Sequence, residues 1–514
     1  MSSKGATQRL AFLCVLLLGA ALRMQHVTQL YVDGFAWREA DTASIAEAFA
    51  AGHWNIFMPE VRWGGPGPNY VGAEFQTVSY IVAIGYRLFG TSATTGRVVS
   101  TAFGLWGIFA LYMLVSRVWD QRRALSASAV MAVLPGSVII ERSFLSDGAM
   151  TALMTSSLWM LVAHGQTRRD RYLYGAALFG LLGCLTKLPG CILAIPAAYS
   201  VLSIYGERLY EPGVGLRIGT ALLTVAVPVA AYYLWERHVS LAYPPHHLFG
   251  QDKFVWNSGI TAWLSHRYFL GGFWQHATTL LWTIPFMALA VVGFIVSCRD
   301  RNGSTGSRLF HYWFLAMGIR YLLEADHLVS DPYNIHLFNP VIAVFAGQAL
   351  ISVADSTLRL RSPPLGTVAA ILLFAGSSIY AQLAVQQWFD EPYRSHYVIG
   401  QTLSELSQPG DLVITMGLEP VALYHSRRMG WIFPPGERAS DGGEGWDHGP
   451  IDASTLRELR SRGGHWLGIP AWNSYTQRGN QDYIRDTYPA LYAEMLEDFE
   501  IVRDLPEGLI LRAR

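Results

Sequence analysis

The stretch Trp37–Ala46, WREADTASIA, places one cation and two carboxylates within four residues, as Arg38, Glu39 and Asp41. A positioned carboxylate can take the proton of a hydroxyl group while that hydroxyl attacks an electrophilic carbon. A guanidinium can bind a phosphate through two donors at once. This spacing therefore predicts acid–base chemistry beside an anionic group. The structural alternative is an interfacial helix in which Arg38 pairs with Asp41 at i,i+3.

Other charged residues lie at the ends of apolar segments and are candidates for the same chemistry. Glu74 lies in YVGAEF, Asp147 in RSFLSDGAM and Lys187 in LTKLPG, while Lys253 and Arg267 lie in a later polar stretch. A departing phosphate needs fixed positive charge, which the basic residues of this set can supply as substrate-binding groups. The structural alternatives are a helix N-cap role for Asp147 and a snorkelling side chain for Lys187.

The composition places these charges in a membrane protein. The chain has 514 residues, of which 51% are hydrophobic and 15% are charged. Soluble domains carry about 25% charged residues. Charged groups at the edge of a bilayer are functional candidates by default, which favours a functional role for the residues above. The formal net charge of zero gives no bulk electrostatic case for binding nucleic acid.

A polytopic helical domain is expected to position these residues. A helix that crosses a bilayer needs about 20 apolar residues. About eleven segments qualify, which gives a transmembrane domain over residues 1–389; they are 9–30, 97–117, 124–141, 146–164, 172–186, 188–205, 216–236, 277–298, 309–323, 334–354 and 366–387.

The arginine-rich loops predict how the chain is oriented. Alternate loops carry clusters such as Arg168, Arg169 and Arg171, and the positive-inside rule places such loops in the cytoplasm. With the N-terminus inside, the loop 31–96 lies outside and contains the active site. Its apolar segment 75–90 is too short to span comfortably, so we expect a helix lying at the interface. A spanning segment there would invert every later arginine-rich loop.

The last part of the chain, residues 390–514, has the composition of a soluble domain. DLVITMG, HWLGIP and GLILRAR predict short buried strands, and STLRELRSRGG predicts a helix that ends at a glycine. Alternating strands and helices favour a small α/β domain. The odd number of spans places this domain outside the cytoplasm.

Four short motifs give the chain a family resemblance. They are WREADT (37–42), GAEF (72–75), RLFG (87–90) and Arg97. Together they resemble the polyprenyl-phosphate-dependent glycosyltransferases of the multi-span C-type fold (GT-C), which include protein O-mannosyltransferases and the aminoarabinose transferases of lipid A. The likeness is to a bacterial branch whose first loop reads Trp-Arg-Gln-Ala-Asp-Thr. It covers about residues 9–210, and 211–390 in outline.

The resemblance implies that an acidic residue of the first external loop is the catalytic base. Many members carry an adjacent Asp-Glu pair, which would fall on Arg38 and Glu39, whereas Asp41 matches the branch motif. Side chains two residues apart in a helix point about 200° from each other. We therefore expect Asp41 to be the base, with Glu39 as the second candidate. Glu74 stands where lipid A transferases have a phosphate-contacting lysine, so hydroxyl binding, metal ligation and helix capping stay open for it.

The activity that the resemblance implies is inverting transfer of a hexosyl or pentosyl group from a polyprenyl-phosphate donor. The acceptor would be a hydroxyl of a glycan such as lipopolysaccharide, of a lipid or of a protein, at the external face of the inner (plasma) membrane. Some relatives use a divalent metal, for which Glu39, Asp41, Glu74 and Asp147 have the oxygen ligands.

Two other classes of function are the alternatives. A lipid-linked glycan transporter or flippase usually shows internal repeats, and the sequence has none. A membrane sensor with an external binding domain would explain residues 390–514 but would leave the acids of the first loop without a task. A related transfer from a lipid carrier, as by an O-antigen-type ligase, is the nearest variant of the enzyme hypothesis.

Overall fold

The computed structural model describes residues 3–245, 266–299, 308–356, 363–417, 419–433, 452–473 and 478–514. Within these residues the chain forms two compact units that alternate along the sequence. The first unit comprises Met1–Val27, Arg97–Tyr232 and Asp252–Gln387. The second comprises Thr28–Gly96, Tyr233–Gln251 and Trp388–Arg514. The second unit therefore joins the first predicted external loop to the C-terminal region.

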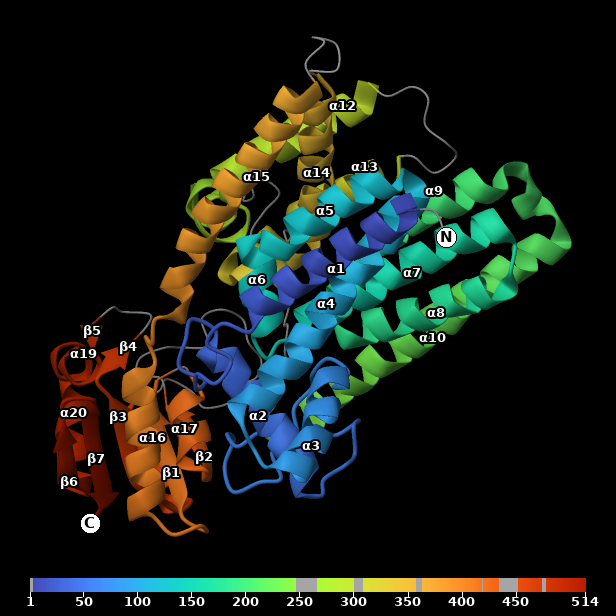
Figure 1. Ribbon diagram of the computed structural model, residues 1–514. Helices are drawn as coiled ribbons and strands as arrows, with labels where there is room; N and C mark the ends of the chain where they lie inside the picture. Colours follow the sequence, from blue (N-terminus) through green and yellow to red (C-terminus); the bar gives the residue numbers. More distant parts are fainter. Residues whose placement is uncertain are drawn as a thin grey trace. The chain divides into compact units, whose positions relative to one another are not determined.

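The first unit is helical (Figure 1). Its elements, including two helices that continue into the second unit, are α1 (Ser3–Arg23), α4 (Ala93–Val118), α5 (Gln121–Val133), α6 (Pro135–Arg142), α7 (Asp147–Thr167), α8 (Asp170–Thr186), η1 (Leu188–Leu193), α9 (Ala194–Tyr205), η2 (Gly206–Tyr210), α10 (Pro212–Ala242), η4 (His266–Trp274), η5 (Ala277–Leu281), α12 (Thr283–Arg299), α13 (Leu309–Ser330), η6 (Pro332–Phe338), α14 (Asn339–Ser356) and α15 (Pro363–Gln386).

All eleven predicted segments contain helix, but they differ in how well they could cross a bilayer. In the described residues, six helices are long and apolar enough, or up to eight if each of two bent pairs is one span. In the first bent pair, α5 and α6 meet at an angle of 62°. In the second, the segment Phe269–Leu281 and α12 meet at an angle of 100°. Of the others, α8 has only 17 residues, α7 carries several threonines and serines, and α13 carries Arg320, Glu324 and Asp326. Buried polar residues can be paired inside a helical bundle, so short or partly polar helices also occur there.

The second unit contains two helices from the first loop and a small C-terminal sheet with its helices. The elements are α2 (Ala36–Ala51), α3 (Thr77–Phe89), η8 (Gln387–Phe389), α16 (Arg394–Leu406), β1 (Leu412–Met416), α17 (Val421–Ser426), β2 (Met429–Phe433), α18 (Ala453–Ser461), β3 (Gly464–Pro470), β4 (Trp472–Asn473), β5 (Arg478–Gly479), α19 (Asn480–Thr487), α20 (Pro489–Asp498), β6 (Phe499–Leu505) and β7 (Gly508–Ala513).

The C-terminal sheet has the strand order β2-β1-β3-β7-β6. Strand β1 is parallel to β2 and β3, whereas β7 is antiparallel to β3 and β6. The three predicted strands are β1, β3 and β7, and the predicted helix is α18. Asp452 caps α18 by accepting hydrogen bonds from the amides of Ser454 and Thr455, and Gly463, at φ +101°, follows its end.

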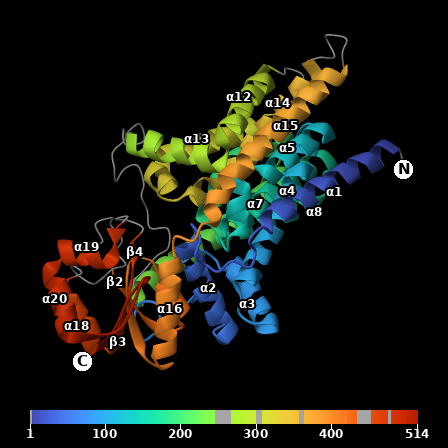
Figure 2. The ribbon, with the colours of Figure 1, turned by 60° about the vertical axis from the view of Figure 1, so that its left-hand side comes forward.

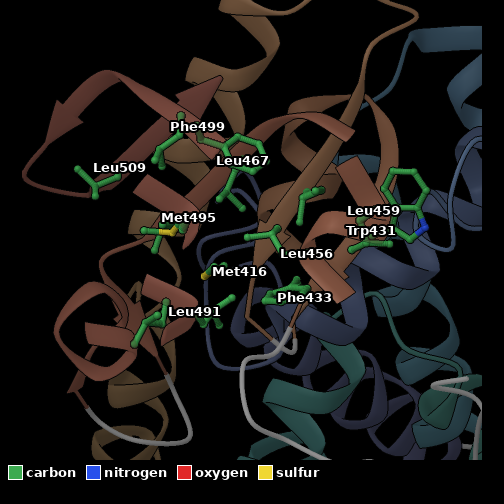
Figure 3. Close-up of a cluster of buried hydrophobic side chains, with 14 residues drawn as sticks. Met416, Trp431, Phe433, Leu456, Leu459, Leu467, Leu491, Met495, Phe499 and Leu509 are labelled. Carbon is green, nitrogen blue, oxygen red and sulfur yellow. The ribbon is translucent and has the colours of Figure 1, made fainter. Parts of the chain in front are cut away.

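The two faces of this sheet have different partners. On one face, Leu456 and Leu459 of α18 and Leu491 and Met495 of α20 form a core with strand residues such as Leu467 (Figure 3). Figure 2 shows α16 on the side of the sheet opposite to α18 and α20. The core on that second face also contains residues of the first loop and its helices, which are Ile45, Phe49, Val61, Trp63, Val71, Ala73 and Ala83. One hydrophobic core therefore connects the first loop to the C-terminal sheet.

Helix α3 has 13 residues, which is too short to cross a bilayer. Its buried residues, such as Val78 and Val82, lie on one side, while Ile81, Ile84, Leu88 and Phe89 are exposed. An apolar exposed face on a short helix is typical of a helix that lies in the interface. The length agrees with the expectation that segment 75–90 does not span, and its location at the interface stays a prediction.

Candidate active site

Helix α2 carries the charged stretch that raised the question of function. Seven alanines in its 16 residues favour the helix, and Gly52, with φ +121°, ends it. Residues on most sides of α2 are buried, so both acids of the stretch are enclosed. Glu39 is 0% exposed and Asp41 is 3% exposed. Buried carboxylates require partners, and the partners distinguish the two residues.

Asp41 lies among groups that suit a general base. Its Oδ1 atom accepts a hydrogen bond of 2.8 Å from Nε1 of Trp63. Nearby, Nη2 of Arg38 donates to Oε1 of Glu74 over 2.7 Å. The Arg38 and Glu74 side chains are 12% and 13% exposed, which gives this group of residues a solvent-facing side. The structure thus brings Arg38, Asp41 and Glu74 of the predicted site together.

The surroundings of Asp41 bring the pKa of its carboxyl group close to neutral pH. Burial raises the pKa of Asp41 to about 6, and the charge of Glu74 acts in the same direction. The Arg38 charge and the Trp63 hydrogen bond oppose this rise in the pKa. A base with a pKa just below the working pH is ionised and still binds a proton well, which is the favourable range for general base catalysis.

Glu39 faces a different environment. Its charge raises the pKa of Tyr31 and Tyr86, although burial is the largest cause in both. The hydroxyl oxygens of these two tyrosines lie 3.5 Å apart. Asp41, in contrast, acts with Arg38 and Glu74. The two acids of α2 therefore point to different groups, as the helical angle between them predicts.

Glu74 is fixed by a residue that the sequence analysis does not name. The amide of Ala73, next to Glu74, donates to Oε2 of Glu236 over 2.5 Å. Glu236 is fully buried and lies near the C-terminal end of α10. The signal for it is visible in the sequence: a glutamate within a long apolar segment is a functional or structural candidate. Trp63 is the other unnamed member of the site, and a tryptophan in a Gly/Pro-rich loop carries no comparable signal.

Asp147 and Lys187 form a second charged group, within the first unit. The Nζ atom of Lys187 lies 2.9 and 2.8 Å from the two carboxylate oxygens of Asp147. It also lies 4.7 Å from the ring centroid of Tyr333. Asp147 is the first residue of α7, after Ser146 at the N-cap, so the N-cap role considered for Asp147 is wrong. Lys187 follows the end of α8 and pairs with this acid.

Among the described residues, the structure gives no specific contact that supports substrate binding by the remaining two predicted residues, Arg267 and Lys253. Arg267 is 77% exposed at its side chain and lies 4.0 Å from Asp326. An ion pair this exposed and this long contributes little to stability and does not fix the guanidinium in one position. Lys253 lies outside the described residues.

Few side chains near Asp41 could act as ligands of a divalent metal ion. In the part of the chain that the structure describes, no three His, Cys, Asp or Glu side chains are grouped to hold a metal. Asp41 and Glu74 are the two carboxylates that lie together, and Arg38 pairs with Glu74. The described residues therefore show no ready set of oxygen ligands for Mg²⁺ or Ca²⁺, which bind six or more oxygens.

Comparison with known proteins gives a family match and a fold. Residues 77–232 match the family model described as dolichyl-phosphate-mannose-protein mannosyltransferase. No curated protein sequence matches the chain significantly. The fold and the family match agree with the resemblance to polyprenyl-phosphate-dependent, multi-span glycosyltransferases of the GT-C type.

Two groups of solved structures share this fold. Crystal structures of ArnT from Cupriavidus metallidurans, in the apo state and bound to undecaprenyl phosphate, superpose with TM-scores of 0.65 and 0.62. They are 15% and 14% identical in sequence, and each match covers 99% of this chain and 98% of the other. The apo oligosaccharyltransferase of Archaeoglobus fulgidus is 14% identical, with a TM-score of 0.60 over 89% of this chain and 69% of the other. The chain is thus a multi-span membrane protein with the fold of these enzymes.

Proposed function

We propose that the protein is an inverting membrane glycosyltransferase. It moves a hexosyl or pentosyl group from a polyprenyl-phosphate donor to an acceptor hydroxyl at the external face of the membrane. The family match to a dolichyl-phosphate-dependent mannosyltransferase and the fold shared with an undecaprenyl-phosphate-bound ArnT support a lipid-phosphate donor. The acceptor is a glycan, a lipid or a protein of the cell envelope.

The observation that carries the proposal is the environment of Asp41. It is a nearly buried carboxylate with a pKa raised to about 6, held by Trp63 and placed beside the Arg38–Glu74 pair. Together with the family match, its place beside a fixed cation favours a transferase over a transporter or a sensor. Perturbed carboxylates beside a fixed cation are typical of sites that do acid–base chemistry.

The reaction is a single displacement. The acceptor oxygen attacks the anomeric carbon of the donor sugar while Asp41 takes the hydroxyl proton. The bond from the anomeric carbon to the phosphate oxygen breaks, and its electron pair leaves with the polyprenyl phosphate. One displacement inverts the anomeric centre and needs no carboxylate nucleophile.

Arg38 is proposed to stabilise the departing phosphate. A guanidinium has five N–H donors in a fixed plane, so it can hold Glu74 and contact a second anion. Arg38→Lys should therefore bind the donor more weakly, by about tenfold, because an ammonium cannot make the planar two-donor contact. Donor affinity measured by competition with polyprenyl phosphate tests this. Equal affinity in Arg38→Lys and in Arg38→Gln would show that Arg38 only holds the loop.

The remaining parts of the proposal concern location. The membrane domain, residues 1–389, lies in the inner (plasma) membrane, and residues 390–514 lie outside the cytoplasm. The external loop 31–96 carries the base. Apolar helices such as α10 and α15, whose spans are 6% and 17% buried within the protein, offer the lipid-facing surfaces that a polyprenyl chain requires.

The direct test is activity of the purified protein. It is incubated with a panel of polyprenyl-phosphate sugars and mixed acceptors from the cell envelope, and release of polyprenyl phosphate is measured. Release from one donor, abolished in Asp41→Asn, is the expected result. Failure to release polyprenyl phosphate from any donor, with a folded protein and envelope acceptors present, contradicts the proposal.

A further inference from the structure

Asp41 receives its hydrogen bond from a residue in a different part of the loop. Trp63 donates from Nε1 to Oδ1 of Asp41 over 2.8 Å, and the two residues are 22 positions apart in the sequence. Trp63 is 4% exposed, so its ring is fixed by packing on nearly all sides. It lies in one core with Ile45 and Phe49 of α2 and with Ile432 of β2. The position of the indole N–H relative to Asp41 therefore depends on the tertiary fold and not on the local sequence.

The backbone that carries Trp63 is bound to the C-terminal sheet. The amides of Gly64 and Gly65 donate to the carbonyl oxygen of Gly430 over 2.9 and 2.8 Å, and the amide of Gly430 donates to the carbonyl of Arg62 over 3.1 Å. Gly430 lies in β2, at the edge of the five-stranded sheet. The segment around Trp63 covers this edge, which would otherwise expose unpaired backbone groups.

The close approach at β2 depends on the absence of a side chain. A Cβ atom on Gly430 would lie 1.8 Å from the carbonyl oxygen of Val413 in β1. On the loop side, a Cβ atom on Gly65 would lie 3.3 Å from Nε1 of Trp431. Gly430 thus lets β2 lie close to β1, while Gly64 and Gly65, at φ +117° and +125°, give the segment after Trp63 the backbone conformation in which it bonds to β2.

We propose that Trp63 is a positioning residue for Asp41 and that strand β2 of the C-terminal sheet holds Trp63 in place. The C-terminal region then forms part of the catalytic apparatus, since it sets the orientation of the base. This inference rests on the proposed function, with Asp41 as the base, and adds to it a task for the C-terminal sheet and for the loop 62–65.

The proposal has a consequence for the proton affinity of the base. Three groups face Asp41: Arg38 from its own helix, Glu74 from the segment before α3, and the Trp63 indole from the segment at β2. An N–H donor stabilises the ionised carboxylate more than the protonated one. Without the donor, the pKa of Asp41 rises from its present value of about 6.

The test replaces the indole N–H and retains the shape of the ring. Benzothienylalanine at position 63 substitutes sulfur for the N–H, and Trp63→Phe is the genetically simpler variant. The acid limb of the pH profile of kcat/KM should move upward by about one unit in both, because a hydrogen bond to a charged group is worth roughly one to two pKa units. At high pH, Asp41 is ionised in every variant. There, kcat of the benzothienylalanine variant should approach kcat of the wild-type protein.

Trp431→Phe is the matched control. Trp431 is 2% exposed and lies in β2 against Gly65, but its Nε1 atom has no hydrogen-bond partner among the described residues. Its replacement removes a buried indole from the same place without removing a bond to Asp41. The pH profile of this variant should stay at the wild-type position. Trp431→Phe leaves the backbone bonds between Gly430 and the loop in place. An equal shift in this variant would show that the profile does not report the N–H of Trp63, and would overturn the specific role of Trp63.

The remaining outcomes separate this inference from the proposed function. If Asp41→Asn is inactive and the profile with benzothienylalanine at position 63 superimposes on that of the wild-type protein, the positioning role is wrong while the base assignment stands. If Asp41→Asn keeps its activity, the base assignment itself is wrong and the inference fails with it. Thermal unfolding of each variant in detergent excludes loss of the fold, and the isosteric amino acid keeps the test available if Trp63→Phe does not fold.

Discussion

Two acids stand two residues apart in α2, and their surroundings assign them different tasks. Asp41 lies with Arg38 and Glu74, where a charge can act on a substrate, whereas Glu39 lies with Tyr31 and Tyr86. The identity of the base therefore depends on where each side chain points and not on which acid is stronger in isolation. Exchange of each carboxyl for its amide separates the two roles.

Asp41→Asn retains size and most hydrogen bonds but removes the basic group. Turnover should fall by about two to four orders of magnitude, the usual contribution of a positioned base, while donor binding is retained. Glu39→Gln, which introduces the residue found in the Trp-Arg-Gln-Ala-Asp-Thr branch, should keep most of its activity. Initial rates of polyprenyl phosphate release check both. The reverse pattern would assign the base to Glu39, and two active variants would direct the search to Glu74 or Asp147.

The raised pKa of Asp41 also has a consequence for stability. Its pKa is about 6 in the folded protein against 3.8 for the ordinary carboxyl group, so the folded state favours the protonated form. Stability from this group is highest below about pH 4 and declines as pH rises to about 6. Asp41→Asn, which cannot ionise, should thus unfold at a higher temperature than the wild-type protein at pH 7 and at a similar temperature at pH 4. Thermal unfolding in detergent at both pH values checks this, and a lower unfolding temperature at pH 7 would show that Asp41 stabilises the fold.

At the scale of elements, local signals predict well and long-range pairing does not. Strands β1, β3 and β7 are short apolar runs between turn residues, and α18 has an Asp cap and a Gly end, so sequence identifies all four. Strand β6, FEIVRDL, mixes charged and apolar residues without a regular alternation and carries a weaker signal. The Trp63–Asp41 bond and the Glu236–Ala73 bond join distant positions, and no local pattern encodes such contacts.

The Asp147–Lys187 pair connects the start of α7 to the end of α8. Asp147 is 3% exposed at its side chain, and Lys187 is 13% exposed. Lys187→Met leaves a nearly buried carboxylate without its cation, so the protein should lose about 3 kcal/mol of stability. Asp147→Asn combined with Lys187→Met should recover most of that loss, because neither charge is left alone.

A double-mutant cycle of thermal unfolding measures this coupling, and donor affinity measured on the same variants tests the binding role. Weaker donor binding in the stable double variant would support Lys187 as a phosphate-binding cation. Unchanged donor affinity would leave the pair a structural connection between α7 and α8.

At the scale of the whole molecule, the chain alternates between its two units. It leaves the first unit after Val27, returns at Arg97 and leaves it finally at Gln387. Composition predicts a membrane part and a soluble C-terminal part, but it does not predict that Thr28–Gly96 and Trp388–Arg514 form one unit. That union arises from side-chain packing in the core that contains Trp63, Ile432 and Ile510.

This union gives a strict prediction for topology. Since the first loop and the C-terminal sheet share a hydrophobic core, both must lie on the same side of the membrane. The arginine-rich loops predict that this side is external. Reporter tags at Gln121 and Arg169 should therefore be cytoplasmic, and tags at the exposed Pro66 and Gly410 should be external. Cysteine labelling with a membrane-impermeant reagent, in a variant without native cysteines, reads out all four positions in intact cells. Labelling at Pro66 and Gly410 on opposite sides would contradict the shared core. A cytoplasmic location for both would place the proposed base on the wrong side for an external acceptor.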